Sequence, residues 1–145
     1  MSKVSKKAVH YFNNGLCCAE SVLLSVSESK GIESPLIPKI ATGFCGGMSH
    51  TNGTCGAIAG GIIAIDMMHG RTKPDDNRDC SEERVQNLVT SFKNKFGSTK
   101  CYKLTGCDLG TDEGQEKYNI NEVYELCDNL VDFATDKTIE LIDKE

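Results

Sequence analysis

The apolar residues of this chain recur every three or four positions rather than at every second one. This periodicity is typical of helices that bury one face, and few segments show the strict alternation of a half-buried strand. The pattern predicts a first helix over residues 4–13 and a second over residues 17–29, each followed by a glycine that stops it. Pro35 and Pro38 predict the start of a short third helix that runs towards Gly43.

The second half of the chain carries the clearest amphipathic segments. Residues 81–96 place apolar side chains on one stripe, and Asp79 followed by Glu82 resembles a capping box at its start. Residues 121–138 predict another helix with its own apolar face. We therefore predict an all-α fold, and a compact helical bundle is the architecture that these helices favour.

Length and polarity indicate how the chain is organised. With 145 residues, the chain fits one domain with a real hydrophobic core, so we expect a single domain over residues 1–145. The polar, proline-containing stretch 70–79 is interpreted as an exposed loop and not as a domain boundary.

Charge and aromatic content limit the partners that we expect. Sixteen basic and twenty-one acidic residues give a net charge of -5, and the chain has no tryptophan, which disfavours a nucleic-acid or anionic-membrane surface. The longest apolar stretch, residues 57–68, contains Asp66 and is shorter than the about 20 residues of a membrane span. Residues 8–29 mix polar and apolar side chains and lack the core of a signal peptide. We expect a cytoplasmic protein without nucleic-acid partners or membrane insertion.

Cysteine is the most informative residue type, because eight occur in a chain with no secretion signal: Cys17, Cys18, Cys45, Cys55, Cys80, Cys101, Cys107 and Cys127. In a reducing compartment, such thiols more often bind metal or do redox chemistry than form a disulfide framework. No Cys-x-x-Cys pair occurs. This absence excludes the usual zinc knuckle, the thioredoxin-type active site, the tandem Cys-x-x-Cys motif of ferredoxins and covalently bound c-type haem. A dispersed set forms a site only if the fold gathers it.

A glycine-rich loop precedes a helix near the middle of the chain. Thr54 is a natural N-cap, which places Cys55 at or near the first helical position. The helix dipole there favours a thiolate, so we expect a lowered pKa and a reactive or metal-binding Cys55. The alternative is that Cys55 is only a small residue in a crowded turn.

The residues after Cys55 leave one face of this helix almost bare. Gly56, Gly60 and Ala64 recur every four residues, and each interior glycine costs about 0.5–1 kcal/mol relative to alanine. Close packing of another helix is the favoured reason, and a cofactor in contact with Gly56 and Gly60 is the alternative. The loop lacks the lysine of a P-loop and the preceding strand of a dinucleotide fold.

The arrangement of these motifs resembles that of a known family. The core Cys55-Gly56-Ala57-Ile58-Ala59-Gly60 is preceded by a cysteine in residues 15–23 and followed by others in residues 101–109 and 127–131. In order and spacing the chain resembles the C_GCAxxG_C_C family of redox-active proteins over nearly its whole length.

The resemblance implies a ligand set and a cofactor. The four signature cysteines fall on Cys18, Cys55, Cys101 and Cys127, and the family resemblance implies a helical domain that holds an iron–sulfur cluster or another prosthetic group. A related domain occurs in a cytochrome with haem and iron–sulfur centres, and only the cluster is carried over here, because the haem motif is absent. Four thiolates accept zinc equally well. Cys107 is the favoured fifth ligand, because it and Cys101 flank one short turn.

The remaining candidates differ from the family pattern or lie outside it. Cys45 stands where the family commonly has glycine, and His50 lies just upstream of the core motif. Cys17 is interpreted as incidental, because a disulfide to its neighbour would be strained. Cys80 and His69 are interpreted as bystanders.

Three functions are consistent with these residues. The first is electron transfer through an iron–sulfur cluster or another metal. This function requires a redox partner protein, and it is compatible with a homodimer. The second is metal-free thiol–disulfide chemistry, with Cys55 as the nucleophile and Cys101 or Cys107 as the resolving thiol. The third is a non-catalytic interaction module whose cysteines pack the core. No hydrolase-type constellation is evident.

Overall fold

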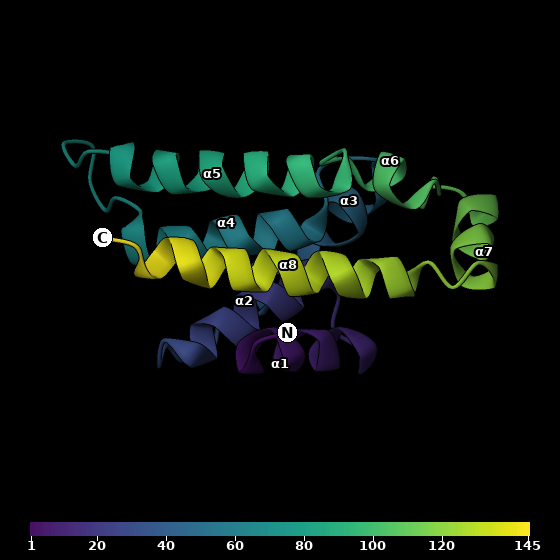
Figure 1. The fold of residues 1–145 in the computed structure, drawn as a ribbon, viewed down its shortest axis with the longest axis horizontal. Coiled ribbons are helices and arrows are strands. Elements are labelled where there is room, and N and C mark those ends of the chain that lie inside the picture. The colour runs from purple at the N-terminus through teal and green to yellow at the C-terminus, as the bar shows by residue number, and fades with distance from the viewer.

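Helices make up all the regular structure of the computed structural model, which describes residues 1–145 (Figure 1). The only strand-like pairing is an isolated bridge between Thr54 and Lys100. The elements are α1 (Lys3–Asn13), α2 (Cys18–Ser29), the 3-10 helix η1 (Lys39–Phe44), α3 (Cys45–His50), α4 (Gly56–His69), α5 (Asp79–Phe96), α6 (Cys101–Thr105), α7 (Asp112–Ile120) and α8 (Tyr124–Asp143). The predicted all-α fold is therefore confirmed.

Helix α4 forms the centre of the bundle. Helices α4, α5 and α8 run side by side, α2 packs across α4, and α1 lies against α2 and α8 (Figure 1). The short helices α3, α6 and α7 gather at the end of the bundle opposite the C-terminus (Figure 1). None of the helices combines the length and hydrophobicity needed to cross a membrane.

The small residues of α4 allow it to lie in the middle of the core. A side chain at Gly60 would collide with the backbone of Ala19 in α2, and one at Gly61 would meet Thr138 of α8. Close helix packing therefore explains the bare face of this helix beyond its first turn. Around it pack the largest buried side chains, among them Leu23, Ile58, Ile65, Leu88, Phe92 and Val131.

Several helix boundaries differ from the sequence prediction. Helix α5 begins at Asp79, and Arg78 is its N-cap without a side-chain cap, so the predicted capping box is wrong. The helix predicted over residues 121–138 is present as α8, which begins later, at Tyr124, and continues to Asp143. A positive φ of 50° at Glu122 separates α8 from the preceding helix α7, which ends at Ile120.

Two further segments are close to the prediction. The third helix is present as η1, but it is a 3-10 helix and Pro38 is its N-cap. The stretch between α4 and α5 is the expected loop, and nearly all of its residues are exposed.

Candidate functional site

One cavity of about 300 Å³, with walls formed by residues from α1 to α4 and α6 to α8, is lined by six cysteines, and four of these are the signature cysteines. They come from four different elements: Cys18 begins α2, Cys55 precedes α4, Cys101 begins α6, and Cys127 lies in the first turn of α8. Apolar side chains complete much of the wall, including Phe12, Leu104, Leu109 and Leu130. The fold therefore gathers the four signature cysteines that were dispersed in the sequence.

Two backbone hydrogen bonds bring Cys55 and Cys101 to the same wall. The Cys55 N–H donates to the Thr99 carbonyl over 2.8 Å, and the Cys101 N–H donates to the Gly53 carbonyl over 2.9 Å. These bonds flank the Thr54–Lys100 bridge. Thr54 thus pairs with the chain before α6, and Cys55, not Thr54, is the N-cap of α4.

The loop that faces Cys101 winds in the left-handed direction. Gly47 has a φ of 74°, and Met48 and Ser49, with φ of 64° and 58°, continue this conformation. Left-handed backbone costs about 1–2 kcal/mol per non-glycine residue, and here it is held in part by the Ser49 hydroxyl, which donates to the Gly43 carbonyl over 2.7 Å. A Cβ on Gly47 would lie 3.3 Å from the Cys101 Sγ, so this turn leaves the space that the thiol occupies.

Burial keeps the four thiols protonated in the metal-free protein. Burial, followed by the other cysteines, raises the pKa of Cys55 well above its ordinary value. Burial likewise raises the pKa of Cys18, that of Cys101 to about 11 and that of Cys127 to about 12. The expected lowering of the Cys55 pKa is therefore corrected, because desolvation outweighs the hydrogen bond from the backbone of Ala57.

The sulfur atoms are spaced too widely for one small ion. Four sulfurs around a tetrahedral zinc ion at 2.3 Å are about 3.8 Å apart. No three of the four cavity sulfurs lie within 4.8 Å of one another, because Cys17, Glu20 and Cys45 form the one acid, histidine or cysteine group that is so closely spaced. As placed, the four sulfurs do not form a preassembled site for a single tetrahedral ion.

Tyr118 is a part of this site that the sequence did not indicate. Its hydroxyl donates to the Cys127 Sγ over 3.4 Å from α7, and it lines the cavity. Burial and the neighbouring cysteine raise the Tyr118 pKa, so the phenol keeps its proton and remains a donor. Nothing in the local sequence of a short polar helix marks this tyrosine.

The other predicted ligands and contacts divide between the cavity and its surroundings. Gly56 lines the cavity beside Cys18, whereas Gly60 packs against α2. Cys107 is buried, but it is not part of the cavity wall, and its Sγ lies 3.4 Å from the Thr105 carbonyl. Its role as a fifth ligand stays a prediction.

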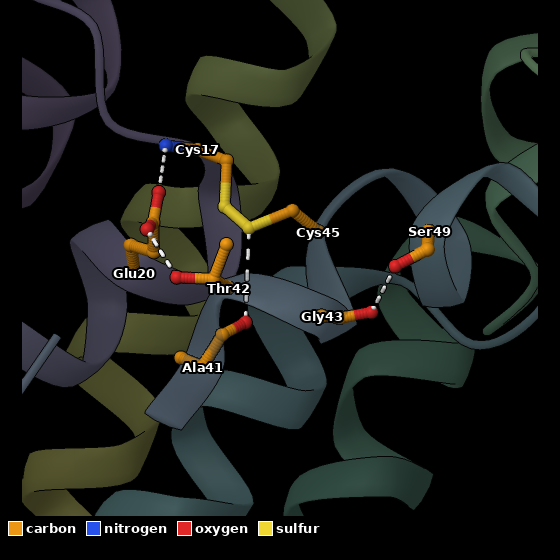
Figure 2. The surroundings of a disulfide bond; sticks show 7 residues. All are labelled: Cys17, Glu20, Ala41, Thr42, Gly43, Cys45 and Ser49. Carbon is orange, nitrogen blue, oxygen red and sulfur yellow. Dashed lines mark hydrogen bonds between the residues drawn. A yellow bond between two sulfur atoms is a disulfide. The ribbon is translucent and has the colours of Figure 1, made fainter. Parts of the chain in front are cut away.

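Cys17 and Cys45 form a disulfide that the sequence did not predict (Figure 2). The two residues are 28 positions apart, with a Cα–Cα distance of 5.8 Å, and both line the cavity. Cys17 is therefore not incidental, and its partner is not the adjacent Cys18. In the sequence, the one indication of this disulfide was Cys45, which stands where the family commonly has glycine.

His50 lines the cavity, whereas Cys80 and His69 lie away from it. Cys80 is exposed, and its Sγ lies 2.8 Å from Nη1 of Arg84 and 3.6 Å from Nδ1 of His69. These two side chains are outside the four-cysteine site, as expected, although they contact each other.

Comparison with known proteins identifies the family. No curated protein and no solved structure matches the chain. The family described as "Putative redox-active protein (C_GCAxxG_C_C)" matches residues 16–141, a range that contains all the cysteines of the cavity. The chain therefore belongs to the C_GCAxxG_C_C family of redox-active proteins.

Proposed function

We propose that this protein transfers electrons through an iron–sulfur cluster held by Cys18, Cys55, Cys101 and Cys127. The observation that carries the proposal is that four elements each direct one cysteine to the wall of a cavity of about 300 Å³. Their sulfurs are too far apart for one tetrahedral ion, which favours a polynuclear group over a single zinc ion.

The chemistry of the donors fits such a cluster. Iron–sulfur clusters are typically held by four cysteine thiolates, and soft sulfur ligands select iron–sulfur or zinc over hard cations. When bound, the cluster supplies a reversible one-electron couple. The thiols are neutral in the metal-free protein because burial raises their pKa, so loading releases their protons.

The chain itself contributes rigidity, a dry wall and a hydrogen bond. Cys18 and Cys101 begin helices, and Cys55 caps one, so their backbones are fixed before any ligand binds. Apolar side chains keep water from much of the wall. The Tyr118 hydroxyl donates to the Cys127 sulfur, and hydrogen bonds to ligand sulfurs are one of the factors that set a cluster's potential. A redox partner protein would exchange the electron.

The test is to replace each of the four cysteines by serine and to reconstitute the variants with iron and sulfide without oxygen. We expect each variant to lose the visible absorption band and most of its iron. Cys80→Ser is the matched control, because this exposed thiol lies outside the cavity, and it should retain both. Far-ultraviolet circular dichroism shows whether each variant is folded. A folded Cys55→Ser variant with full iron and an unchanged spectrum would refute the proposal.

A further inference from the structure

The disulfide lies beside the four-cysteine site. Cys17 directly precedes Cys18 in the chain, and Cys45 directly precedes the left-handed loop that faces Cys101. Both disulfide residues contribute to the cavity wall and are half-buried, so their sulfur atoms are neither sealed in the core nor remote from the site.

We propose that Cys17 and Cys45 are a reversible dithiol–disulfide couple that exchanges two electrons with a thiol or disulfide substrate. The pair is a second redox site, chemically different from the four thiols around the cavity. Its thiol exchange does not depend on the proposed cluster.

The exchange balances with a dithiol as the reductant. One thiolate of the dithiol attacks a sulfur of the pair, the Cys17–Cys45 bond breaks, and a mixed disulfide forms. The second thiol of the dithiol then attacks the mixed disulfide and leaves as the oxidised substrate. Two electrons and two protons pass from the dithiol to Cys17 and Cys45, which become thiols, and a substrate disulfide reverses the sequence.

One carboxylate joins the two segments that carry the pair (Figure 2). Oε1 of Glu20 accepts from the Cys17 N–H over 3.0 Å, and Oε2 accepts from the Thr42 hydroxyl over 2.8 Å. Thr42 lies in η1, three residues before Cys45. Because this bridge does not involve the sulfurs, it holds the start of α2 near the end of η1 after the disulfide is reduced. The two thiols thus keep a high effective concentration for re-oxidation.

The surroundings also provide for the reduced form. The Ala41 carbonyl oxygen lies 3.8 Å from the Cys45 Sγ, within reach of a thiol proton once the sulfur carries one (Figure 2). The contact between Glu20 and the Cys17 N–H also belongs to the capping box of α2, so it does not depend on whether the disulfide is open or closed. The geometry therefore favours a pair that opens and closes with the fold intact.

The test is a redox titration of the full chain in mixtures of reduced and oxidised dithiothreitol. Free thiols are alkylated at each ratio, and peptide mass spectrometry reports Cys17 and Cys45 separately. We expect both to become labelled together, to lose the label again as oxidised dithiothreitol is raised, and to leave the helical circular dichroism unchanged.

The bridge provides a matched pair of variants. Glu20→Ala should shift the equilibrium about tenfold towards the dithiol, which corresponds to about 30 mV for a two-electron couple. Glu28→Ala is the control, because Glu28 lies on the same helix and binds Lys7 and Tyr11 instead. Equal midpoints for Glu20→Ala and the unchanged chain would refute the role of the bridge.

Three results would overturn the couple itself. Full labelling of both cysteines before reduction would show that no disulfide forms. A pair that stays unlabelled in excess dithiothreitol while the protein is folded would be a structural disulfide. If a chelator without any reductant made both cysteines available for labelling, Cys17, Glu20 and Cys45 would bind a metal ion instead.

The two proposals fail separately. Iron and acid-labile sulfide are measured on the same samples of the unchanged chain in which the labelling of Cys17 and Cys45 is titrated. Cys127→Ser should lose the iron but keep the dithiothreitol titration. A chain that loads iron without a reversible pair refutes only the couple, and a reversible pair without iron refutes only the cluster.

Discussion

The contact between α4 and α2 predicts that Gly60→Ala destabilises the protein, although alanine is the better helix former. A Cβ at this position would lie 3.1 Å from both the carbonyl carbon and the Cα of Ala19, and closer still to its carbonyl oxygen. These are backbone atoms, so no side chain can rotate away and α2 must move as a unit.

The expected size follows from two opposing effects. Replacing a glycine inside a helix gains about 0.5–1 kcal/mol, whereas forcing an extra carbon into a packed core typically costs about 1–3 kcal/mol. We expect a net loss of about 1–2 kcal/mol in the free energy of unfolding. For a urea m-value of about 2 kcal/mol/M, the midpoint falls by about 0.5–1 M.

The assay is equilibrium unfolding of the reduced, metal-free protein in urea, followed by far-ultraviolet circular dichroism. Gly43→Ala is the control, because its Cβ would meet nothing closer than the Ser49 Oγ at 4.0 Å and its φ is not positive. We expect the control to stay within about 0.5 kcal/mol of the unchanged chain. A Gly60→Ala variant as stable as the unchanged chain, or more stable, would refute the close approach of these helices.

Three further predictions concern the cavity and its thiols. Gly56→Ala places a Cβ against the Cys18 Sγ and should weaken iron retention about 10–100-fold, measured by competition with a chelator; unchanged retention would show that the sulfur has room to move. In the reduced, metal-free protein, exposed Cys80 should be alkylated at least about tenfold faster than Cys55, which is 5% exposed; the reverse order would restore Cys55 as a reactive thiol. Burial raises the folded-state pKa of Cys127 from 9.0 to about 12, so the folded protein holds the thiol proton more tightly than the unfolded chain does. The resulting contribution to the free energy of unfolding is complete below pH 9 and is lost as the pH rises towards 12. Urea midpoints of Cys127→Ser and the unchanged chain should converge over that range, and a constant difference would contradict the buried neutral thiol.

Helical periodicity predicted the longest elements and the all-α fold, because amphipathic stripes such as that of α5 reflect one-sided burial. The short helices α6 and α7 were not predicted, because a segment of so few residues contains too few repeats of the apolar pattern to indicate a helix. The left-handed loop was also missed, because non-glycine residues such as Met48 adopt that conformation only when tertiary contacts hold them.

The candidate site shows the same division between local pattern and tertiary structure. The family motif gave the four cysteines, but Tyr118 and the partner of Cys17 depend on contacts between distant segments. The direction of the Cys55 pKa was mistaken for a related reason. A helix start is visible in the sequence, whereas the burial that outweighs its effect is visible only in the fold.

The most direct test of the four-cysteine site is the amount of iron, zinc and acid-labile sulfide per chain after purification without oxygen. A polynuclear cluster requires more than one iron per chain, a similar amount of sulfide, and a visible band that reductant bleaches. One zinc per chain without sulfide would contradict the proposed cluster and would require the four sulfurs to move closer together than the structure places them.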